Sequence, residues 1–126
     1  GGILFRCGYF SAEEDYFADP PTIIVSSLVL HQVPLTEKRR IISEANKALS
    51  PDGALLIADY GLQTGLMRFL FRKTVQALDG VQNTQANADG AIPKLLGDAG
   101  FFPVEEIEKL DTVTGSISIL RAHPKR

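Results

Sequence analysis

Two continuous apolar runs on either side of an amphipathic stretch restrict the fold more than any other feature. The first run, Thr22 to Leu30, is rich in β-branched residues and shows no alternation of polar and apolar positions. The second, Ala54 to Ala58, is followed by Asp59. Continuous apolar runs of this length, bounded by prolines and turn residues, are typical of strands buried on both faces. We therefore expect two central strands of a parallel sheet.

The stretch between the runs has the pattern of a surface helix. Apolar residues recur at helical spacing from Thr36 to Leu49, with Thr36 as the predicted N-cap. A Ser-Pro-Asp-Gly turn then ends the helix. The predicted solvent face consists of charged residues, namely Lys38, Arg39, Arg40, Glu44 and Lys47. Strand, helix and strand in this order predict a βαβ unit with parallel strands and a right-handed crossover.

The second half of the sequence predicts two helices and a hairpin. The segment from Leu66 to Leu78 favours a helix that is apolar over more than half of its circumference, and Ile92 to Ala99 favours a short helix. Asp79 to Gly90 is rich in Asn, Gln, Asp and Gly without any period, so we expect a loop. Phe101 to Leu110 and Ser116 to Ala122 predict a β-hairpin. The fold class is α/β, with a parallel βαβ core followed by an antiparallel hairpin.

Composition excludes several classes of protein. The 126 residues allow one domain, and 13 Lys and Arg against 15 Asp and Glu give a net charge of -2, which argues against binding nucleic acid through bulk charge. No apolar stretch is long enough to span a bilayer. Cys7 is the only cysteine, and His31 and His123 are the only histidines, so we expect no His/Cys metal site. A single cysteine fits the reducing cytoplasm.

Candidate functional residues cluster where the two predicted parallel strands end. Ligands of open α/β sheets bind outside these carboxyl ends. Ser26, Ser27 and His31 lie at the end of the first strand and Asp59 at the end of the second. The serines could bind a ligand or the nearby backbone, His31 could be a base or a packing residue, and Asp59 could contact a ligand or a helix N-terminus. No Gly-x-Ser-x-Gly elbow and no phosphate-binding glycine loop occurs, which argues against a hydrolase and a self-contained nucleotide site.

Four segments resemble the second half of a class I S-adenosylmethionine-dependent methyltransferase of the type 11 or ubiquinone/menaquinone methyltransferase kind. They are the run from Ile24 to His31, the Leu-Ser-Pro-Asp-Gly turn with the strand up to Tyr60, Leu95 to Phe101, and Thr114 to Ile119. The resemblance covers about Ile3 to Ala122. It implies a partial Rossmann-like sheet, in which Ile3 to Gly8 would be the third strand of the family's 3-2-1-4-5-7-6 order.

The resemblance also implies a division of the site residues. Tyr9, Phe10 and Ser11 would border the adenine of S-adenosylmethionine, and Ser26 and Ser27 would approach its amino-acid end. The acceptor would be faced by Asp59, Tyr60, Asn83, Thr84 and Asn87. Methyl transfer depends on alignment and electrostatics and can proceed without an enzyme nucleophile. His31 is the candidate base where one is needed.

Two departures from the family lead to an expectation about the whole chain. The glycine-rich cofactor loop and the acidic residue that binds the ribose would lie upstream of Gly1, and Tyr9 stands where the family often has Asp. We therefore expect residues 1–126 to be one incomplete domain, inactive alone, from a methyltransferase acting on a small hydrophobic or lipid-like acceptor. The run from Thr22 to Leu30 would form an open sheet edge that re-pairs or supports a homodimer. The alternative is a non-enzymatic α/β module that binds another protein through this edge.

Overall fold

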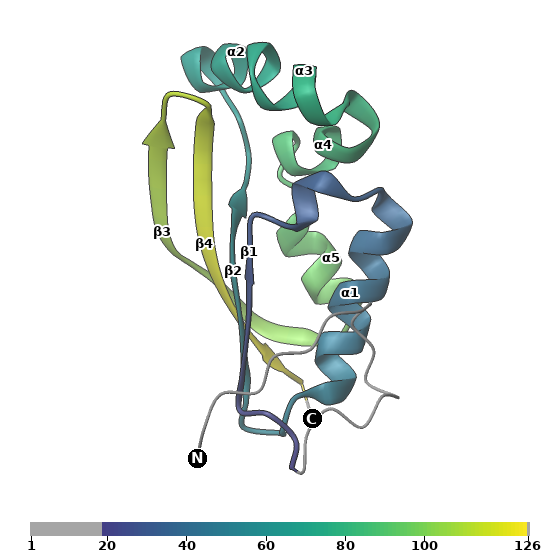
Figure 1. Cartoon of the computed structure of the whole chain (residues 1–126). Helices are drawn as coiled ribbons and strands as arrows, with labels where there is room; N and C mark the ends of the chain where they lie inside the picture. Colours follow the sequence, from purple (N-terminus) through teal and green to yellow (C-terminus); the bar gives the residue numbers. More distant parts are fainter. Residues whose placement is uncertain (1–18, 126) are drawn as a thin grey trace, which may run out of the picture.

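The computed structural model describes residues 19–125 and shows a four-stranded sheet with helices packed on one side (Figure 1). The expected strand Ile3 to Gly8 and the expected adenine-lining segment lie outside the described residues. The elements in chain order are β1 (Ile23–Ser27), η1 (Leu30–Gln32), α1 (Leu35–Ala48), β2 (Ala54–Tyr60), α2 (Gly65–Lys73), α3 (Val75–Asp79), α4 (Val81–Ala88), α5 (Ile92–Asp98), β3 (Phe101–Thr112) and β4 (Gly115–Pro124).

The sheet has the strand order β1-β2-β4-β3. β1 and β2 are parallel, with Ile23 opposite Ala54, and α1 provides the crossover between them. β4 is antiparallel to both of its neighbours and lies between β2 and β3. The α/β fold with a parallel pair and an antiparallel hairpin is confirmed. Its order is also that expected for the last four strands of the resembled family, 4-5-7-6.

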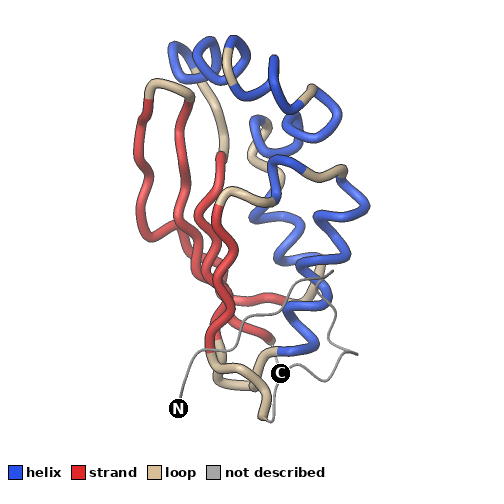
Figure 2. Tube along the Cα trace, in the orientation of Figure 1, coloured by secondary structure: helices blue, strands red, loops and turns tan. Residues whose placement is uncertain are grey.

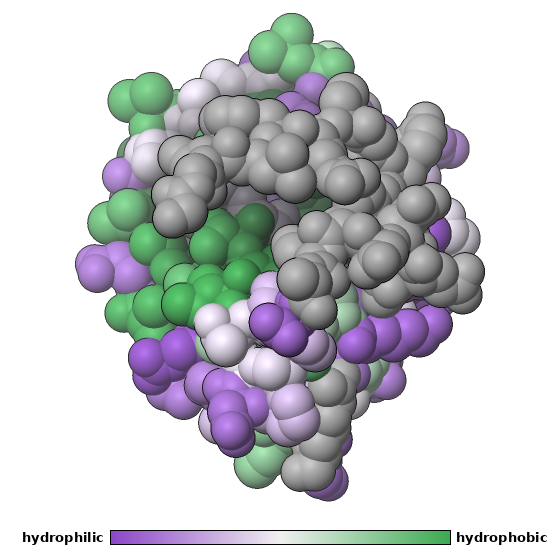
Figure 3. Space-filling view, turned by 60° about the horizontal axis from the view of Figure 1, so that its bottom comes forward, coloured by the Kyte–Doolittle hydropathy of each residue, from purple (hydrophilic) through white to green (hydrophobic). Residues whose placement is uncertain are grey.

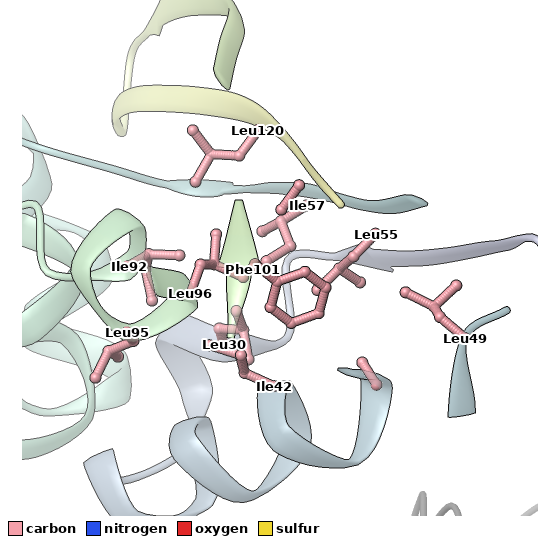
Figure 4. Close-up of a cluster of buried hydrophobic side chains, with 12 residues drawn as sticks. Leu30, Ile42, Leu49, Leu55, Ile57, Ile92, Leu95, Leu96, Phe101 and Leu120 are labelled. Carbon is pink, nitrogen blue, oxygen red and sulfur yellow. The ribbon is translucent and has the colours of Figure 1, made fainter. Parts of the chain in front are cut away.

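The hydrophobic core lies between the sheet and helices α1 and α5 (Figure 4). Alternate residues of β2 and β4 point into it, as the period of two in a strand requires. Leu30, Phe101 and Leu96 close the layer between sheet and helices, with exposed fractions of 2% or less. The twelve buried members are Leu30, Ile42, Ala45, Leu49, Leu55, Ile57, Ile92, Leu95, Leu96, Phe101, Leu120 and Ala122.

The other side of the sheet has no helix among residues 19–125, as the single-sided layer of helices in Figure 2 shows. The prediction that the first strand is buried on both faces is therefore wrong. β1 is shorter than expected, lies at the sheet edge, and leaves Ile23 60% and Val25 64% exposed. Figure 3 shows hydrophobic side chains gathered into one continuous area on the side of the molecule that it presents.

Two predicted helices also differ from the structure. α1 begins at Leu35 after Pro34, so Thr36 is the second helical residue and not the N-cap. The helix expected from Leu66 to Leu78 is two helices, α2 and α3, separated at Thr74, whose φ of -115° and ψ of -79° depart from helical values. Within residues 19–125 no helix is long and apolar enough to cross a membrane.

The segment from Asp79 to Gly90 is not the expected loop, because most of it forms α4. Gly80, at φ +87°, separates α3 from α4. The Gly80 carbonyl accepts both the Thr84 amide, at 3.3 Å, and the Thr84 hydroxyl, at 2.7 Å, within the first turn of α4. α4 is attached through polar side chains that bond to backbone groups. It therefore lacks the apolar period by which a helix is predicted from sequence.

Candidate functional site

The polypeptide bends sharply after β1, and the bend places His31 beside the end of β2. Leu28 has φ +55°, a left-handed conformation that is uncommon for a residue with a bulky side chain. Its amide still donates to the Ala58 carbonyl at 2.8 Å, so the bend remains attached to β2. Leu30 and His31 then turn inward in η1 and are buried, with 0% and 4% exposed.

Asp59 at the end of β2 holds this bend in place. One carboxylate oxygen, Oδ2, accepts the Leu30 amide at 2.7 Å. The other, Oδ1, accepts the amide of Tyr60 at 2.8 Å and lies 2.7 Å from Nδ1 of His31. Asp59 is 2% exposed, and a buried carboxylate requires such donors to offset the loss of hydration. The arrangement gives Asp59 two backbone donors and favours a hydrogen on Nδ1 of His31 directed at Oδ1.

The second ring nitrogen of His31 faces another carboxylate. Nε2 lies 3.4 Å from Oδ2 of Asp79, at the end of α3. With Nδ1–H directed at Asp59, a neutral imidazole presents a lone pair at Nε2, which can accept a proton. Once protonated, Nε2 would be an N–H donor directed at Asp79. Each ring nitrogen of His31 thus lies near one carboxylate.

Tyr60 forms the apolar wall of this site. Its ring meets the His31 ring edge-on, with 4.9 Å between centroids, and packs on Phe71 of α2 at 5.0 Å. Its hydroxyl lies 2.8 Å from Oγ1 of Thr114, in the turn between β3 and β4. Tyr60 therefore connects the imidazole to α2 and to the hairpin, which restricts the ring of His31 to one orientation.

The three residues of α4 that were expected to face the acceptor have structural partners. Asn83 donates from Nδ2 to the Gln32 carbonyl at 3.1 Å, and Asn87 donates from Nδ2 to the Tyr60 carbonyl at 2.7 Å. Thr84 and Asn87 are fully buried, and the Oδ1 atom of Asn87 has no hydrogen-bond partner. The structure thus brings Asn83 and Asn87 next to the segments on either side of His31, where they attach α4 to η1 and β2.

Lys38 is a residue that the sequence analysis misplaced. It was expected on the solvent face of α1, but it is 0% exposed and donates from Nζ to the Val33 carbonyl at 2.6 Å and to the Asn83 carbonyl. Burial lowers the pKa of Lys38, and attraction to Asp59 partly opposes this shift. Helical spacing alone placed Lys38 among solvent-facing charges, because it cannot show that α4 packs over that end of α1.

Gln63 is a second buried residue that the sequence analysis missed. Its Nε2 donates to the carbonyls of Gly61 at 2.9 Å and of Ser116 at 2.7 Å, while its Oε1 accepts the Ser116 amide at 2.8 Å. These bonds join the segment after β2 to the start of β4. No sequence signal marks Gln63, because it lies in an irregular segment without any period.

Ser26 and Ser27 lie beside a groove of about 520 Å³ between β1 and α1. Apolar side chains such as Ile24, Ile41 and Leu55 line most of it, with Glu37 and Arg40 also in its wall. The two serine side chains have no hydrogen-bond partner among residues 19–125, so both hydroxyls are available to a ligand. The predicted adenine-contacting residues Tyr9, Phe10 and Ser11 lie outside the described residues. No group of three or more potential metal ligands occurs within the described part of the chain.

Comparison with known proteins gives a fold but no family membership. No protein-family model and no curated protein matches the chain. Human N-acetylserotonin methyltransferase, solved in complex with SAM, is 19% identical with a TM-score of 0.63, over 90% of this chain and 33% of that protein. A putative O-methyltransferase from Nostoc punctiforme is 16% identical with a TM-score of 0.61, over 89% of this chain and 34% of that one.

A further similar structure is the magnesium protoporphyrin IX methyltransferase from Synechocystis, solved with bound SAH. It is 20% identical with a TM-score of 0.58, over 87% of this chain and 48% of that one. At these identities the similarity establishes the fold alone. This chain spans between a third and a half of the length of the three structures. The fold of residues 19–125 is that of the C-terminal part of S-adenosylmethionine-dependent methyltransferases.

Proposed function

We propose that this chain is the C-terminal part of an S-adenosylmethionine-dependent methyltransferase, in which His31 accepts a proton from a small-molecule acceptor. The observation that supports this most directly is the contact of 2.7 Å between His31 Nδ1 and Asp59 Oδ1 at the carboxyl ends of two parallel strands. Ligands of open α/β sheets bind at these ends. The shared fold with methyltransferases supports the reaction class.

The proposed role of His31 follows from the bonds to its two nitrogens. Asp59 fixes the hydrogen on Nδ1, so the lone pair of Nε2 is the proton acceptor. Removing a proton from an acceptor hydroxyl or amine makes that atom a better nucleophile. Asp79, at 3.4 Å from Nε2, would then stabilise the positive charge on the ring. Asp59 and Tyr60 act on the acceptor through His31, because both orient its ring.

The described residues fit one side of a site for S-adenosylmethionine. The unpartnered hydroxyls of Ser26 and Ser27 and the groove beside them suit a ligand with both polar and apolar parts. When bound, the cofactor supplies the electrophilic methyl group. Tyr9, Phe10 and Ser11 remain the proposed contacts of its adenine. The sequence contains no glycine-rich cofactor loop. We therefore propose that further residues complete the site.

Burial reduces the number of residues that can contact the acceptor. Asn83 lies at an exposed hydrogen bond next to η1, so it remains a proposed acceptor contact. We propose none for Thr84 and Asn87, because both are fully buried against main-chain partners. The apolar exposed side chains of α2, Leu66 and Phe69, support a hydrophobic acceptor. Both lie on α2, the helix whose Phe71 packs on Tyr60.

Calorimetric titration of the chain with S-adenosylmethionine tests the proposal. We expect measurable binding that is weakened by Ser27→Leu, which fills the groove beside β1. Ser43→Ala, on α1 and away from the groove lining, is the matched control and should leave binding unchanged. No binding at millimolar cofactor would argue against a cofactor site on this chain and favour the second candidate function.

That second candidate is a non-enzymatic α/β module that binds a second copy of this chain or another protein through β1. The exposed Ile23 and Val25 on an edge strand favour it, because an edge presents unpaired backbone groups that can add a strand. Oligomeric state in sedimentation separates the two candidates when it is measured together with cofactor binding.

A further inference from the structure

A second cavity, separate from the groove beside β1, is lined by the end of β2, the hairpin and the start of α5. Its volume is about 380 Å³, within the range of small-molecule sites. The strand order places β1 on one side of β2 and the β4–β3 hairpin on the other (Figure 1). Residues of the hairpin line this cavity, and none of β1 does. Its walls include apolar side chains from the sheet and from the start of α5, among them Ile57, Leu120, Ile92 and Val104.

A largely buried serine lines this cavity. Ser118 is 7% exposed, and its side chain makes no hydrogen bond to any residue in the range 19–125. It lies directly opposite Asp59 in the pairing of β2 with β4. A Cβ atom on Gly61 would collide with Oγ of Ser118, so glycine at that position makes room for the hydroxyl. The Ser118 hydroxyl can therefore form a hydrogen bond with a polar group of a ligand.

The charges in the cavity wall are all negative. They belong to Asp59, Asp89 and Glu106, and no lysine, arginine or histidine lines the cavity. Asp89 Oδ1 forms an ion pair with Arg68, at 3.5 Å, and accepts a hydrogen bond from Nε2 of Gln85, at 2.8 Å. Glu106 has no ion pair or hydrogen bond of its side chain within the described part of the chain. Asp59 Oδ2 accepts the Leu30 amide alone, which leaves it capacity for a further donor.

We propose that this cavity is a binding site for a small organic cation, an ammonium group on a compact apolar body. The ammonium group would lie between Glu106 and Asp59 and be contacted by the Ser118 hydroxyl, and the apolar body would contact Ile57 and Leu120. Charge-assisted hydrogen bonds of this kind are the strong ones in protein sites. The site goes beyond the proposed methyl transfer, because it is lined by neither Ser26, Ser27 nor His31, although it shares Asp59 and Tyr60 with the surroundings of His31.

NMR titration of the ¹⁵N-labelled chain with benzylamine tests the proposal, with benzyl alcohol as the neutral probe of nearly the same shape. We expect benzylamine to bind with a dissociation constant of about 1 mM, a reasonable affinity for a ligand of so few atoms. The amide signals of Ser118, Gly61 and Gly90 should shift on binding. Benzyl alcohol should bind about tenfold more weakly, because it cannot form a charged hydrogen bond.

Two glutamates that are neighbours in the sequence provide a matched pair of variants. Glu106 lines the cavity, whereas Glu105 faces Arg121, at 3.3 Å, on the other side of β3. Glu106→Gln should weaken benzylamine binding about threefold or more, and Glu105→Gln should leave it unchanged. Both side chains are exposed, so each variant should keep the dispersed amide spectrum of the folded chain.

Three results would overturn the proposal. They are equal binding of benzylamine and benzyl alcohol, an equal effect of the two glutamate variants, and shifts confined to amides away from the cavity. The titration contains no S-adenosylmethionine and measures no methyl transfer. Its failure would therefore leave the proposed function untouched, and failure of the cofactor titration would leave this site untouched.

Discussion

The carboxylate of Asp59 receives three hydrogen bonds from two different segments, and this concentration predicts a large effect of a small substitution. Asp59→Asn replaces one acceptor oxygen by an NH₂ group that would face a donor. We expect a loss of about 2–4 kcal/mol in the free energy of unfolding, because buried groups then lose their partners. Urea denaturation measures it, with the exposed Asp52→Asn as control. An equal and small effect of both variants would contradict this role for Asp59.

The tautomer of His31 is a second consequence of the Asp59 contact. We expect the neutral ring to hold its hydrogen on Nδ1, directed at Asp59, as the 2.7 Å distance indicates. Ring ¹⁵N chemical shifts in NMR distinguish the two tautomers, and His123, whose Nδ1 lies 3.0 Å from the Gly53 carbonyl, provides a second signal for comparison. A hydrogen on Nε2 of neutral His31 would argue against its proposed role as a base.

Lys38 predicts a change in stability with pH. Burial lowers its pKa in the folded state, so at pH values between the folded and the unfolded pKa the unfolded state binds more protons. The free energy of unfolding contributed by this residue therefore rises with pH as the ordinary lysine pKa is approached from below. Measured from pH 7 to 10, the wild type should gain stability relative to Lys38→Met.

The exposed Lys94 provides the control for this measurement. Lys94→Met should have a stability that runs parallel to the wild type over the same pH range, because an exposed ammonium group is equally hydrated in both states. A Lys38→Met variant that also runs parallel to the wild type would show that its burial does not shift its titration.

At the level of single residues, the sequence predicted where the site residues lie in the fold better than it predicted their hydrogen-bond partners. His31 and Asp59 could be identified because both follow apolar runs whose carboxyl ends must lie at one edge of a sheet. That they bond to each other, and that Asp79 faces the other ring nitrogen, depends on the left-handed bend at Leu28. No pattern of residue types indicates that bend, since leucine rarely adopts it.

The sequence failed to predict the helix that packs on its neighbours through polar residues. α4 consists largely of Gln, Asn and Thr, and its position depends on hydrogen bonds to η1 and β2 and not on an apolar stripe. β2 and α5, in contrast, were predicted nearly to their ends, because an apolar run and a Pro at the start with Gly after the end are local signals.

Two glycines predict opposite effects of the same substitution on helices. Gly80 joins α3 to α4 at φ +87°, where alanine is strained, so Gly80→Ala should lower the free energy of unfolding by about 1–2 kcal/mol. Gly97 lies within α5 with open space around it, so Gly97→Ala should raise it by about 0.5–1 kcal/mol. Thermal denaturation compares them, and a loss of stability in both would contradict the distinction.

For the whole molecule, the edge at β1, which has no neighbouring strand among residues 19–125, predicts association. We expect the sedimentation coefficient of the chain to rise with concentration, because Ile23 and Val25 and the free backbone of β1 can pair with a second copy. Val25→Lys should abolish the rise, since a charge on an edge strand opposes such pairing. Ile107→Lys, on the opposite edge strand β3, should not. A wild type that stays monomeric at all concentrations would contradict the expectation.

The overall architecture was predictable because it follows from short-range signals combined with few topological rules. A βαβ unit must be parallel with a right-handed crossover, and the short connection at Gly115 requires an antiparallel hairpin. The number of sheet faces that helices cover was not predictable. A continuous apolar run such as that of β1 indicates that burial is needed on both faces, and the described residues provide it on one.

The position of β4 between β2 and β3 has a consequence for synthesis on the ribosome. β3 leaves the ribosome before β4, yet it contacts the sheet only through β4, so neither strand of the hairpin can join β2 until the later one is made. Until then β2 has an unpaired edge of its own, in addition to that of β1. Nascent chains halted before Gly115 should therefore depend on chaperones to a degree that chains extended past Pro124 do not.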